Sequence, residues 1–575
     1  IPSAVGMALA ERIIAAKYGE DVCSHYTYVI AGDGCLMEGI SEEAISTAAH
    51  LGLNKLIVFW DNNNITIDGS VSAANSTDQI KRFQAVGWNT IEIDGHNYDQ
   101  IEQAVAAAQK SDKPTLVACK TQIGYGAPTK CGTSKCHGSP LGAEELAAMR
   151  QNLNWNYEPF EVPADVLEVW RAAGSRSHDA FLAWEKRARA KGREFLDVIA
   201  DKLPAGWDKE LNELKRQAVK EKTKVATRKA SQMCLEAIVP HIPEIVGGSA
   251  DLAASNLTFT SASKTVTKDD YNGNNVMYGI REHAMAAIMN GMALHGGIIP
   301  FGGTFFVFSD YMRPAMRLAA LMGIRVIYVL THDSIGVGED GPTHQPIEHL
   351  ASYRCMPNIL TFRPCDVVET AEAWQIALET EDKPSLLALT RQGLPLLRTS
   401  AEVNLSAKGG YVIAGEDKKR QATIIATGSE VSLAVEAMNK LAEEGIKVVM
   451  PGTSASKIVQ VKNTGDNDAW VRLKMEVTIT GEDGSDLSDE GIKYVHIYGT
   501  SGEWKLNRDD RNFYYEKVLA PGETTEPVME EVRFSAEMGN AYQNCTANVV
   551  ISAQAVQTAN NGDTVMEAAG WPDGE

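Results

Sequence analysis

The sequence lacks the cysteine patterns of a disulfide framework or a zinc site. Its 575 residues include nine cysteines, an odd number, and none of them falls in a CxxC motif. Cys131 and Cys136 come closest to a pair, but no second half of a zinc site accompanies them. This usage is typical of free thiols in a reducing compartment, so we expect a cytoplasmic protein.

A lipid-facing hydrophobic run and an excess of positive charge are also missing. The longest mostly apolar stretch, residues 284–308, contains Asn290, His295, Pro300 and five glycines, which favours buried α/β structure over a membrane helix. The net charge of −21 argues against a nucleic-acid backbone as partner, although a few Arg and His side chains could still bind small anions. We therefore expect neither a membrane nor a nucleic acid as partner.

The first 450 residues predict a series of α/β domains. Short apolar runs such as HYTYVIAGDG and KLIVFWDNN alternate with helical patterns, which predicts parallel sheets with crossover helices. We expect a first domain over residues 1–205, a second over 206–405 and the start of a third over 406–450. A Lys/Glu-rich stretch at Asp208–Lys224 reads as a helix between the first two.

The pattern changes at about residue 451. In WVRLKMEVTIT, apolar residues from Val471 to Ile479 alternate with polar ones, which predicts strands with one solvated face. Residues 451–575 contain 10 Lys or Arg against 21 Asp or Glu, so this part is strongly acidic. We expect an antiparallel β-sandwich with a structural or adhesive role.

Two polar clusters follow neighbouring apolar runs of the first domain. Asp33 lies between Gly32 and Gly34 in AGDGCLMEG, and Asn63 lies thirty residues later in FWDNNNITIDG. Ligands of parallel sheets bind at the carboxyl ends of strands, so both side chains can face one crevice. A carboxylate, an amide oxygen and a main-chain carbonyl such as that of Ile65 suit Mg²⁺ or Ca²⁺ and leave positions open for phosphates.

GDG followed by an asparagine pair resembles the thiamine diphosphate fingerprint, and GDGCLMEGISEEA is similar to transketolases. Further stretches agree, including CHGSPLG, ATRKASQ, GGSADLAASN, YGIREHAM, GGTFFVFSDYMRPAMR, THDSIGVGEDGPTHQP and LTRQGLP. The resemblance covers about residues 1–449. It implies transfer of a two-carbon ketol unit between sugar phosphates, with thiamine diphosphate and Mg²⁺ (or Ca²⁺) as cofactors, in a homodimer whose active sites lie at the interface.

The resemblance also implies roles for individual residues. Asp33, Asn63 and the Ile65 carbonyl would hold the metal, and Gly34 and His137 would contact the diphosphate. Glu282 would share a proton with the cofactor's pyrimidine ring. The other implied cofactor positions are Glu38, near the subunit interface, Asp251, and a stacking wall of Phe305, Phe308 and Tyr311. These three aromatic residues fall at i, i+3 and i+6, which predicts one helical face.

The substrate positions implied by the resemblance are partly cationic. Guanidinium groups match phosphate oxygens, and Ser or His adds neutral donors. The implied substrate-binding set is Arg228, Ser255, His332, Asp340, His344 and Arg391. His332, His344 and His137 join Glu282 as the implied catalytic residues.

Two features depart from the family pattern. The chain opens at Ile1 inside a helical pattern, so we expect a fragment that lacks the first part of the cofactor domain. Residues 452–560 resemble exported camelysin and TasA-like β-sandwich proteins, which predicts a chimera with an exported C-terminal module. The alternatives are an inactive fragment whose β-sandwich acts in fibres or adhesion, and another thiamine diphosphate enzyme such as deoxyxylulose-phosphate synthase.

Overall fold

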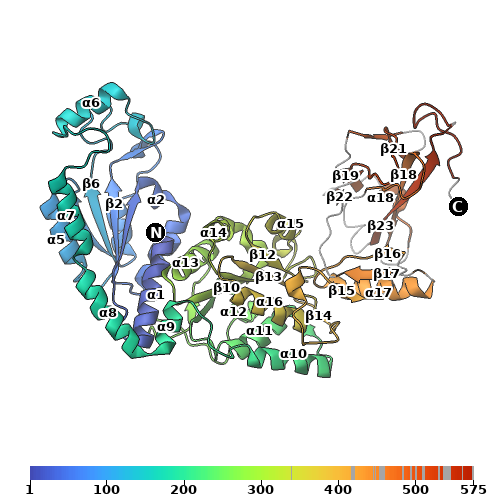
Figure 1. Ribbon diagram of the computed structural model, residues 1–575, viewed down its shortest axis with the longest axis horizontal. Helices are drawn as coiled ribbons and strands as arrows, with labels where there is room; N and C mark the ends of the chain where they lie inside the picture. The colour runs from blue at the N-terminus through green and yellow to red at the C-terminus, as the bar shows by residue number, and fades with distance from the viewer. Residues whose placement is uncertain are drawn as a thin grey trace. The chain divides into compact units, whose positions relative to one another are not determined.

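The structure is a computed structural model that divides into two compact units, Ile1–Thr453 and Ser454–Glu575 (Figure 1). The first unit contains the α/β sheets and the second contains an antiparallel sheet. The described residues are 1–338, 340–415, 421–444, 446, 448–451, 460–481, 485–491, 495–498, 502–507, 512–528, 531–534, 546–559 and 561–572.

The first sheet is parallel throughout, in the order β1-β2-β6-β5. Its strands are β1 (Thr27–Gly32), β2 (Leu56–Asn62), β5 (Asn89–Asp94) and β6 (Thr115–Lys120). Around it lie α1 (Pro2–Tyr18), α2 (Asp33–Met37), α3 (Gly39–His50), α4 (Gln79–Ala85) and α5 (Tyr98–Ala108). The predicted parallel sheet is confirmed, and its helices cover it as crossovers (Figure 1).

A run of helices leads from this sheet to the next one. The helices are α6 (Ala143–Asn152), α7 (Ala164–Ser175), α8 (His178–Lys191), α9 (Arg193–Ile199) and α10 (Lys209–Glu221). The last of them confirms the helix predicted from the Lys/Glu-rich stretch, and it buries Leu211 and Ala218 against the second sheet's layer of helices.

The second sheet is also parallel, in the order β12-β13-β11-β10-β8-β9. Its strands are β8 (Ile245–Ser249), β9 (Asn275–Met277), β10 (Ile299–Phe305), β11 (Ile327–Thr331), β12 (Leu360–Phe362) and β13 (Ser385–Leu389). Its helices are α11 (Thr227–Ile238), α12 (Ala253–Asn256), α13 (Glu282–His295), α14 (Ser309–Met322), α15 (His349–Arg354) and α16 (Val367–Glu379). A short pair, β7 (Val225–Ala226) and β14 (Gly393–Leu394), lies beside it.

Backbone packs directly on backbone where α1 meets α13. A Cβ added to Gly6 would lie 2.0 Å from the Ile288 carbonyl oxygen, and one added to Gly291 would lie 1.9 Å from the Ser3 carbonyl oxygen. Leu9 and Ile13 of α1 share one buried core with residues of α13. The first and second sheets are therefore joined through a helix crossing that only glycine permits.

A third, smaller sheet closes the first unit. It has the order β15-β17-β16, with β15 (Val412–Ala414), β16 (Ala422–Thr423), β17 (Val448–Pro451) and the helix α17 (Glu430–Glu443). Arg363, which follows β12, joins this sheet's helix to the second sheet, because it pairs with buried Asp333 and with Glu430 at the start of α17. The Tyr411 hydroxyl, next to β15, donates to Glu369 of α16. Arg398 donates to both carboxylate oxygens of Glu372 at 2.8 and 2.9 Å in the segment that precedes the third sheet, with both side chains buried. Because buried charges are costly when unpaired, the Arg363 contacts help to fix the third sheet's attachment.

The second unit confirms the predicted antiparallel strands. β18 (Ala469–Thr480) pairs with β23 (Thr546–Gln557) and β21 (Asn512–Tyr515), and β20 (Trp504–Leu506) pairs with β21. β19 (Val495–Tyr498) and β22 (Glu531–Phe534) form a separate pair. Val471, Leu473 and Ile479 are buried whereas Lys474 and Glu476 are exposed, as the alternation predicted.

Two expectations from composition can be compared with the described residues. Among these residues no helix is both long and apolar enough to span a membrane. The apolar run 284–308 folds instead into α13 and β10, which are largely buried. The eight cysteines in the described part of the chain are all free thiols.

The glycine crossing gives a first prediction. Gly6→Ala should destabilise the first unit by about 1–3 kcal/mol, because a methyl group has no room against the Ile288 carbonyl. The measurements are thermal unfolding and hydrogen exchange of the α1 and α13 amides, which should exchange faster in the variant.

Gly174→Ala is the matched control. Gly174 is also helical, in α7, but an added Cβ there would meet no atom within 4 Å. This change should leave stability unchanged or raise it by up to about 1 kcal/mol, because alanine is the better helix former. Equal effects of the two substitutions would contradict the proposed tight crossing.

Candidate active site

Asp33 and Asn63 leave neighbouring strands at the same edge of the first sheet. β1 and β2 are parallel, with Gly32 paired to Asp61. Asp33 is the first residue of α2, directly after β1, and Asn63 directly follows β2. The two residues thirty positions apart in the chain therefore meet at one crevice, as the sequence predicted.

A cavity of about 630 Å³ lies at this edge. Its lining includes Gly32, Asp33, Gly34, Asp61, Asn63, Ile65, His137 and Gly138. His137 follows the short 3-10 helix η2 (Ser134–Cys136). A Cβ added to Gly34 would meet no atom within 4 Å, so the backbone faces open space there. A phosphate group could approach the Gly34 amide without obstruction.

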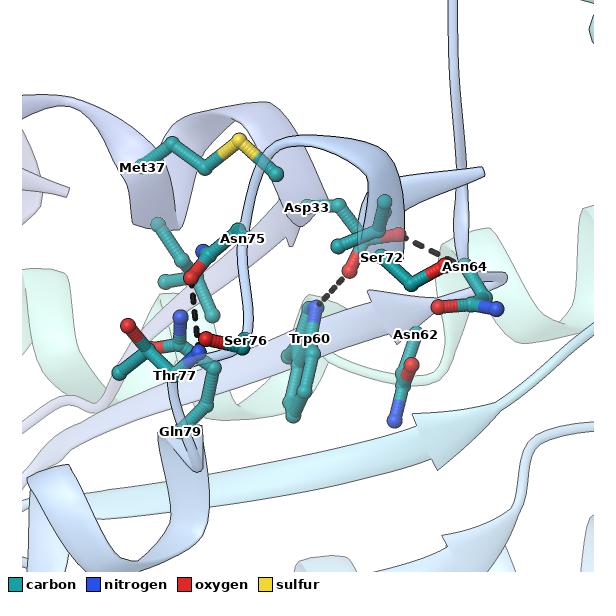
Figure 2. Close-up of a pocket in the computed structure, with 12 residues that line it drawn as sticks. Asp33, Met37, Trp60, Asn62, Asn64, Ser72, Asn75, Ser76, Thr77 and Gln79 are labelled. Carbon is teal, nitrogen blue, oxygen red and sulfur yellow. Dashed lines mark hydrogen bonds between the residues drawn. The ribbon is translucent and has the colours of Figure 1, made fainter. Parts of the chain in front are cut away.

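The Asp33 carboxylate is held in place by two hydrogen bonds (Figure 2). The Trp60 indole donates to one oxygen at 3.0 Å, and the Asn64 amide donates to the other at 3.0 Å. Asn64 adopts a left-handed backbone conformation, with φ 65°, that turns its amide toward Asp33. Burial raises the pKa of Asp33, although both hydrogen bonds act to lower it. A bound cation would favour the ionised form.

Figure 2 shows a second, smaller cavity, which Asp33 also lines. Its volume is about 240 Å³, and Met37, Trp60, Asn62 and Asn75 contribute to its lining. Asp33 therefore contributes to the walls of both cavities.

Asn63 is oriented by contacts at both ends of its side-chain amide. Its oxygen accepts a hydrogen bond from the Ile65 amide at 3.0 Å, and its nitrogen donates to Asp61 at 3.1 Å. Ile65 starts the β3–β4 hairpin (Ile65–Thr66 with Gly69–Ser70). Carbonyl and carboxylate oxygens keep further lone pairs after one hydrogen bond. The oxygen atoms of Asp33, Asn63 and Ile65 therefore form a donor set that fits Mg²⁺ or Ca²⁺.

A second group of predicted residues gathers at the carboxyl ends of β10 and β11. The ring centroids of Phe305 and Phe308 lie 5.8 Å apart in a stacked arrangement. The ring centroid of His332 lies 3.9 Å from that of Phe305, and the ring centroid of His344 lies 5.2 Å from that of Phe308. These four rings make an aromatic wall that joins predicted cofactor and substrate residues.

The expectation that Phe305, Phe308 and Tyr311 share one helical face is wrong. Phe305 ends β10, Phe308 belongs to the 3-10 helix η3 (Phe306–Phe308), and Tyr311 lies in α14. The chain changes conformation within these seven residues, so a 3.6-residue period does not apply. Tyr311 is half exposed and donates its hydroxyl to Glu43 instead of joining the aromatic wall.

His332 is buried and holds a defined tautomer. The Thr331 hydroxyl donates to Asn256 at 2.7 Å, so at its 2.9 Å contact with His332 Nδ1 it accepts. Nδ1 therefore carries the proton, and Nε2 keeps a lone pair. Burial lowers the pKa of His332 to about 4, and the charges of Arg228 and Arg391 contribute. The imidazole is neutral at neutral pH.

The predicted phosphate-binding residues surround His332. Arg228, in α11, donates to the Ser255 carbonyl at 2.6 Å, and Arg391, after β13, donates to the Val337 carbonyl at 3.0 Å. Burial lowers the pKa of Arg228, and the charge of Arg391 contributes. The charge of Asp340 also acts on His332, and that side chain is exposed. These groups leave a cationic region beside a neutral imidazole, which suits an anionic ligand.

Glu43 lies close enough to Glu282 to act on its charge, a neighbour that the sequence did not predict. Glu282 begins α13 and is buried. Glu43, from α3, accepts a hydrogen bond from the Ala284 amide at 2.9 Å in the first turn of α13. Burial raises the pKa of Glu282, and the Glu43 carboxylate adds to the increase. The only signal for Glu43 was its place in the GISEEA motif, which says nothing about α13.

The structure does not bring all the predicted residues together. The larger cavity is lined only by residues between Gly32 and Gly138. The aromatic wall and Arg228 belong to the second sheet. Glu38 and Asp251 are both exposed, and Asp251 adopts a left-handed conformation with φ 60°.

Three family models match the chain. They are described as "Transketolase, thiamine diphosphate binding domain" over residues 1–232, "Transketolase, pyrimidine binding domain" over 223–395, and "Transketolase-like TK C-terminal domain" over 409–534. The third match crosses residue 451, where the sequence analysis expected an exported module to begin. The comparisons therefore do not support the chimera with camelysin and TasA-like proteins.

Curated relatives agree over most of the chain. The transketolase of Cereibacter sphaeroides is 52% identical over 448 residues, which cover 78% of this chain and 68% of that protein. Transketolase 1 of Vibrio vulnificus strain YJ016 is 51% identical over 510 residues, which cover 87% of this chain and 76% of that protein.

Solved structures give the same family. The Pichia stipitis transketolase complex with sedoheptulose-7-phosphate has a TM-score of 0.74 and 42% identity, covering 79% of this chain and 69% of that one. The Campylobacter jejuni transketolase has a TM-score of 0.70 and 37% identity, covering 79% and 70%.

The surroundings of His332 give a second prediction. The pKa of His332 in the folded protein is about 4, below the ordinary histidine value of 6.5, because burial and two nearby guanidinium groups disfavour the imidazolium. As the pH falls, His332 therefore becomes protonated at a higher pH in the unfolded chain than in the folded one. The stability contributed by neutral His332 is complete above pH 6.5 and is lost between pH 6.5 and 4.

NMR titration of the His332 ring measures the pKa of this side chain in the folded protein directly. Arg228→Gln should raise the pKa of His332, because it removes a nearby positive charge. Lys229→Gln removes the same charge from the exposed neighbouring position of α11 and should leave that pKa unchanged. An equal response to both substitutions would mean that the local arrangement around His332 differs from the one described.

Proposed function

The chain belongs to the transketolase family and has transketolase function, and from this premise we propose how its own residues transfer a two-carbon ketol group from a ketose phosphate to an aldose phosphate. The observation that carries the proposal is the meeting of Asp33, Asn63, Ile65 and His137 around one cavity. The relatives reported above are transketolases over 448 or more residues, which favours this reaction over that of deoxyxylulose-phosphate synthase.

The cavity of the first sheet would hold the metal and the diphosphate. Asp33, Asn63 and the Ile65 carbonyl supply oxygen ligands for Mg²⁺ or Ca²⁺, while Gly34 and His137 border the space for the diphosphate. When bound, thiamine diphosphate supplies the nucleophilic carbon for ketol transfer. The protein's part is to fix that group's position and to keep competing water away.

Glu282 would hold the proton that the cofactor's pyrimidine ring requires. Its raised pKa follows from burial and from the nearby Glu43 carboxylate, and both favour the protonated form. Phe305 and Phe308 would provide the stacking wall for the ring, because their faces are stacked and lie beside His332 and His344. Tyr311 would act indirectly, through its hydrogen bond to Glu43.

Arg228 and Arg391 would bind the phosphate end of the sugar. The bound sedoheptulose-7-phosphate in the Pichia stipitis relative supports this class of substrate. Ser255, Asp340 and Asp251 lie at or next to the same strand ends and would contact polar groups of the ligands. Neutral His332, with an unprotonated Nε2, can accept a hydrogen bond from a sugar hydroxyl.

A homodimer would complete the site. The metal cavity belongs to the first sheet, and the aromatic wall belongs to the second. We propose that the second sheet of one subunit serves the cavity of the other, with Glu38 near the interface. The domains would be 1–205, 206–405 and the small sheet that follows. The second unit, which is acidic and antiparallel, would have a structural role.

The third prediction tests the metal site. Asp33→Asn should weaken Mg²⁺-dependent binding of thiamine diphosphate on the order of 100-fold or more, because it removes the charged ligand. Calorimetric titration with thiamine diphosphate and Mg²⁺ measures this. Asp68→Asn is the control, since Asp68 lines the same cavity but is exposed and outside the proposed ligand set. Unchanged binding in Asp33→Asn would contradict the metal-ligand role of Asp33, whereas no binding by the folded unmodified chain would favour the inactive alternative.

The fourth prediction tests the shared site. Asp33→Asn and Glu282→Gln chains should each be inactive alone in a ketol-transfer assay. Unfolding and refolding them together in equal amounts should restore about a quarter of the activity, because half the dimers are mixed and each has one intact site. No recovery, with mixed dimers demonstrated by differently tagged chains, would mean that each subunit builds its own site.

A further inference from the structure

Three potential ligands for a soft metal ion meet away from the cofactor crevice. Cys23 and His25 lie in the connection between α1 and β1, and His295 is the last residue of α13. The Cys23 sulfur and one nitrogen of each histidine all lie within 4.8 Å of one another. His25 and His295 are 270 positions apart in the chain, so this meeting is a product of the fold.

The geometry of the three groups suits a tetrahedral ion. The Nε2 atoms of His25 and His295 are 3.0 Å apart, and their rings are stacked with centroids 5.0 Å apart. A zinc ion bonds imidazole nitrogen at about 2.0–2.1 Å and thiolate sulfur at about 2.3 Å, which separates tetrahedral ligand atoms by about 3.3–3.7 Å. Small side-chain rotations would convert the observed contacts into these separations.

The tautomer of His295 favours a ligand role. Its Nδ1 lies 2.9 Å from the Gly296 carbonyl oxygen, which can only accept, so Nδ1 carries the proton. Nε2 then keeps a lone pair, with which it accepts the hydrogen bond from His25 Nε2, and an ion would take that proton's place once His25 carries its proton on Nδ1. A backbone carbonyl that fixes the far nitrogen of a histidine in this way is the usual outer support of a metal-binding imidazole.

The surroundings of the three side chains leave room for a fourth ligand. The positive charge nearby, which would repel a metal ion, is paired with a carboxylate. A cavity of about 230 Å³ is lined by the three side chains together with Trp184, Phe195 and other apolar residues. The neighbouring cation, Lys55, forms an ion pair with buried Glu11 at 2.6 Å. The Trp184 indole donates to the Val22 carbonyl at 2.8 Å and thereby holds the connection that carries Cys23 and His25.

We propose that Cys23, His25 and His295 bind a divalent ion of the zinc class, with water or another small ligand in the fourth position. Sulfur and imidazole donors select such an ion over Mg²⁺, which prefers oxygen ligands. The site links the connection after α1 to the end of α13, so the bound ion ties the first sheet's domain to the second's. This site is separate from the cofactor crevice and does not depend on the proposed reaction.

The experiment uses the full chain, freed of metal with a chelator and kept reduced, without Mg²⁺ or thiamine diphosphate. Calorimetric titration with Zn²⁺ should give one ion per chain and a higher unfolding temperature in the bound form. His25→Asn and His295→Asn should each weaken this binding by about tenfold or more. Cobalt(II) in place of zinc should give a thiolate-to-cobalt absorption band that Cys23→Ser abolishes.

Two controls separate this site from adventitious binding. His178→Asn and Cys355→Ser replace exposed residues outside the cluster and should leave Zn²⁺ binding unchanged. His25 is exposed, so His25→Asn should fold even if Cys23→Ser does not. The proposal is overturned if Zn²⁺ does not bind saturably, if both histidine variants bind it normally, or if cobalt binds without the thiolate band. Binding of thiamine diphosphate with Mg²⁺, tested on the same variants, should be retained.

Discussion

The arrangement of the first unit depends on the direct contact between the backbones of α1 and α13. Gly6 and Gly291 let the two helices approach until each meets a carbonyl of the other, so neither side of the crossing can accept a larger residue. α1 leads into β1, which Asp33 directly follows, and α13 begins at Glu282. One close contact therefore fixes the first and second sheets of a chain relative to each other, and with them the positions of Asp33 and Glu282 within that chain. Glu43 of α3 reinforces this arrangement at the first turn of α13, where it accepts a hydrogen bond from the Ala284 amide.

Features of local origin could be predicted from the sequence. Apolar runs ending in GDG and in the asparagine cluster placed Asp33 and Asn63 at one sheet edge, because parallel strands present their carboxyl ends together. The alternation from Val471 to Ile479 likewise predicted a strand with one buried face. Such patterns identify strands, but they do not show which family a segment comes from. The acidic C-terminal part therefore resembled an exported module by its strand pattern, although a transketolase-like family model matches through residue 534.

Features that need two distant segments could not be predicted. Glu43 acquires its partners only when α3 meets α13, and His25 meets His295 across 270 positions. The error at Tyr311 has a different cause. No single helical period extends across Phe305–Tyr311, because the chain there passes from a strand through a 3-10 helix into an α-helix. Periodicity is informative only within one kind of backbone geometry.

The hydrogen bonds to Asp33 have a kinetic consequence. Trp60 and Asn64 hold the carboxylate in place, so at the proposed metal site the uptake of an ion would require no rearrangement of that side chain. The slow event would then be the removal of water from the ion itself. Mg²⁺ gives up its hydration shell reluctantly, whereas Ca²⁺ accepts irregular, flexible coordination. A site fixed in this way would admit calcium sooner than magnesium, whichever ion it retains at equilibrium.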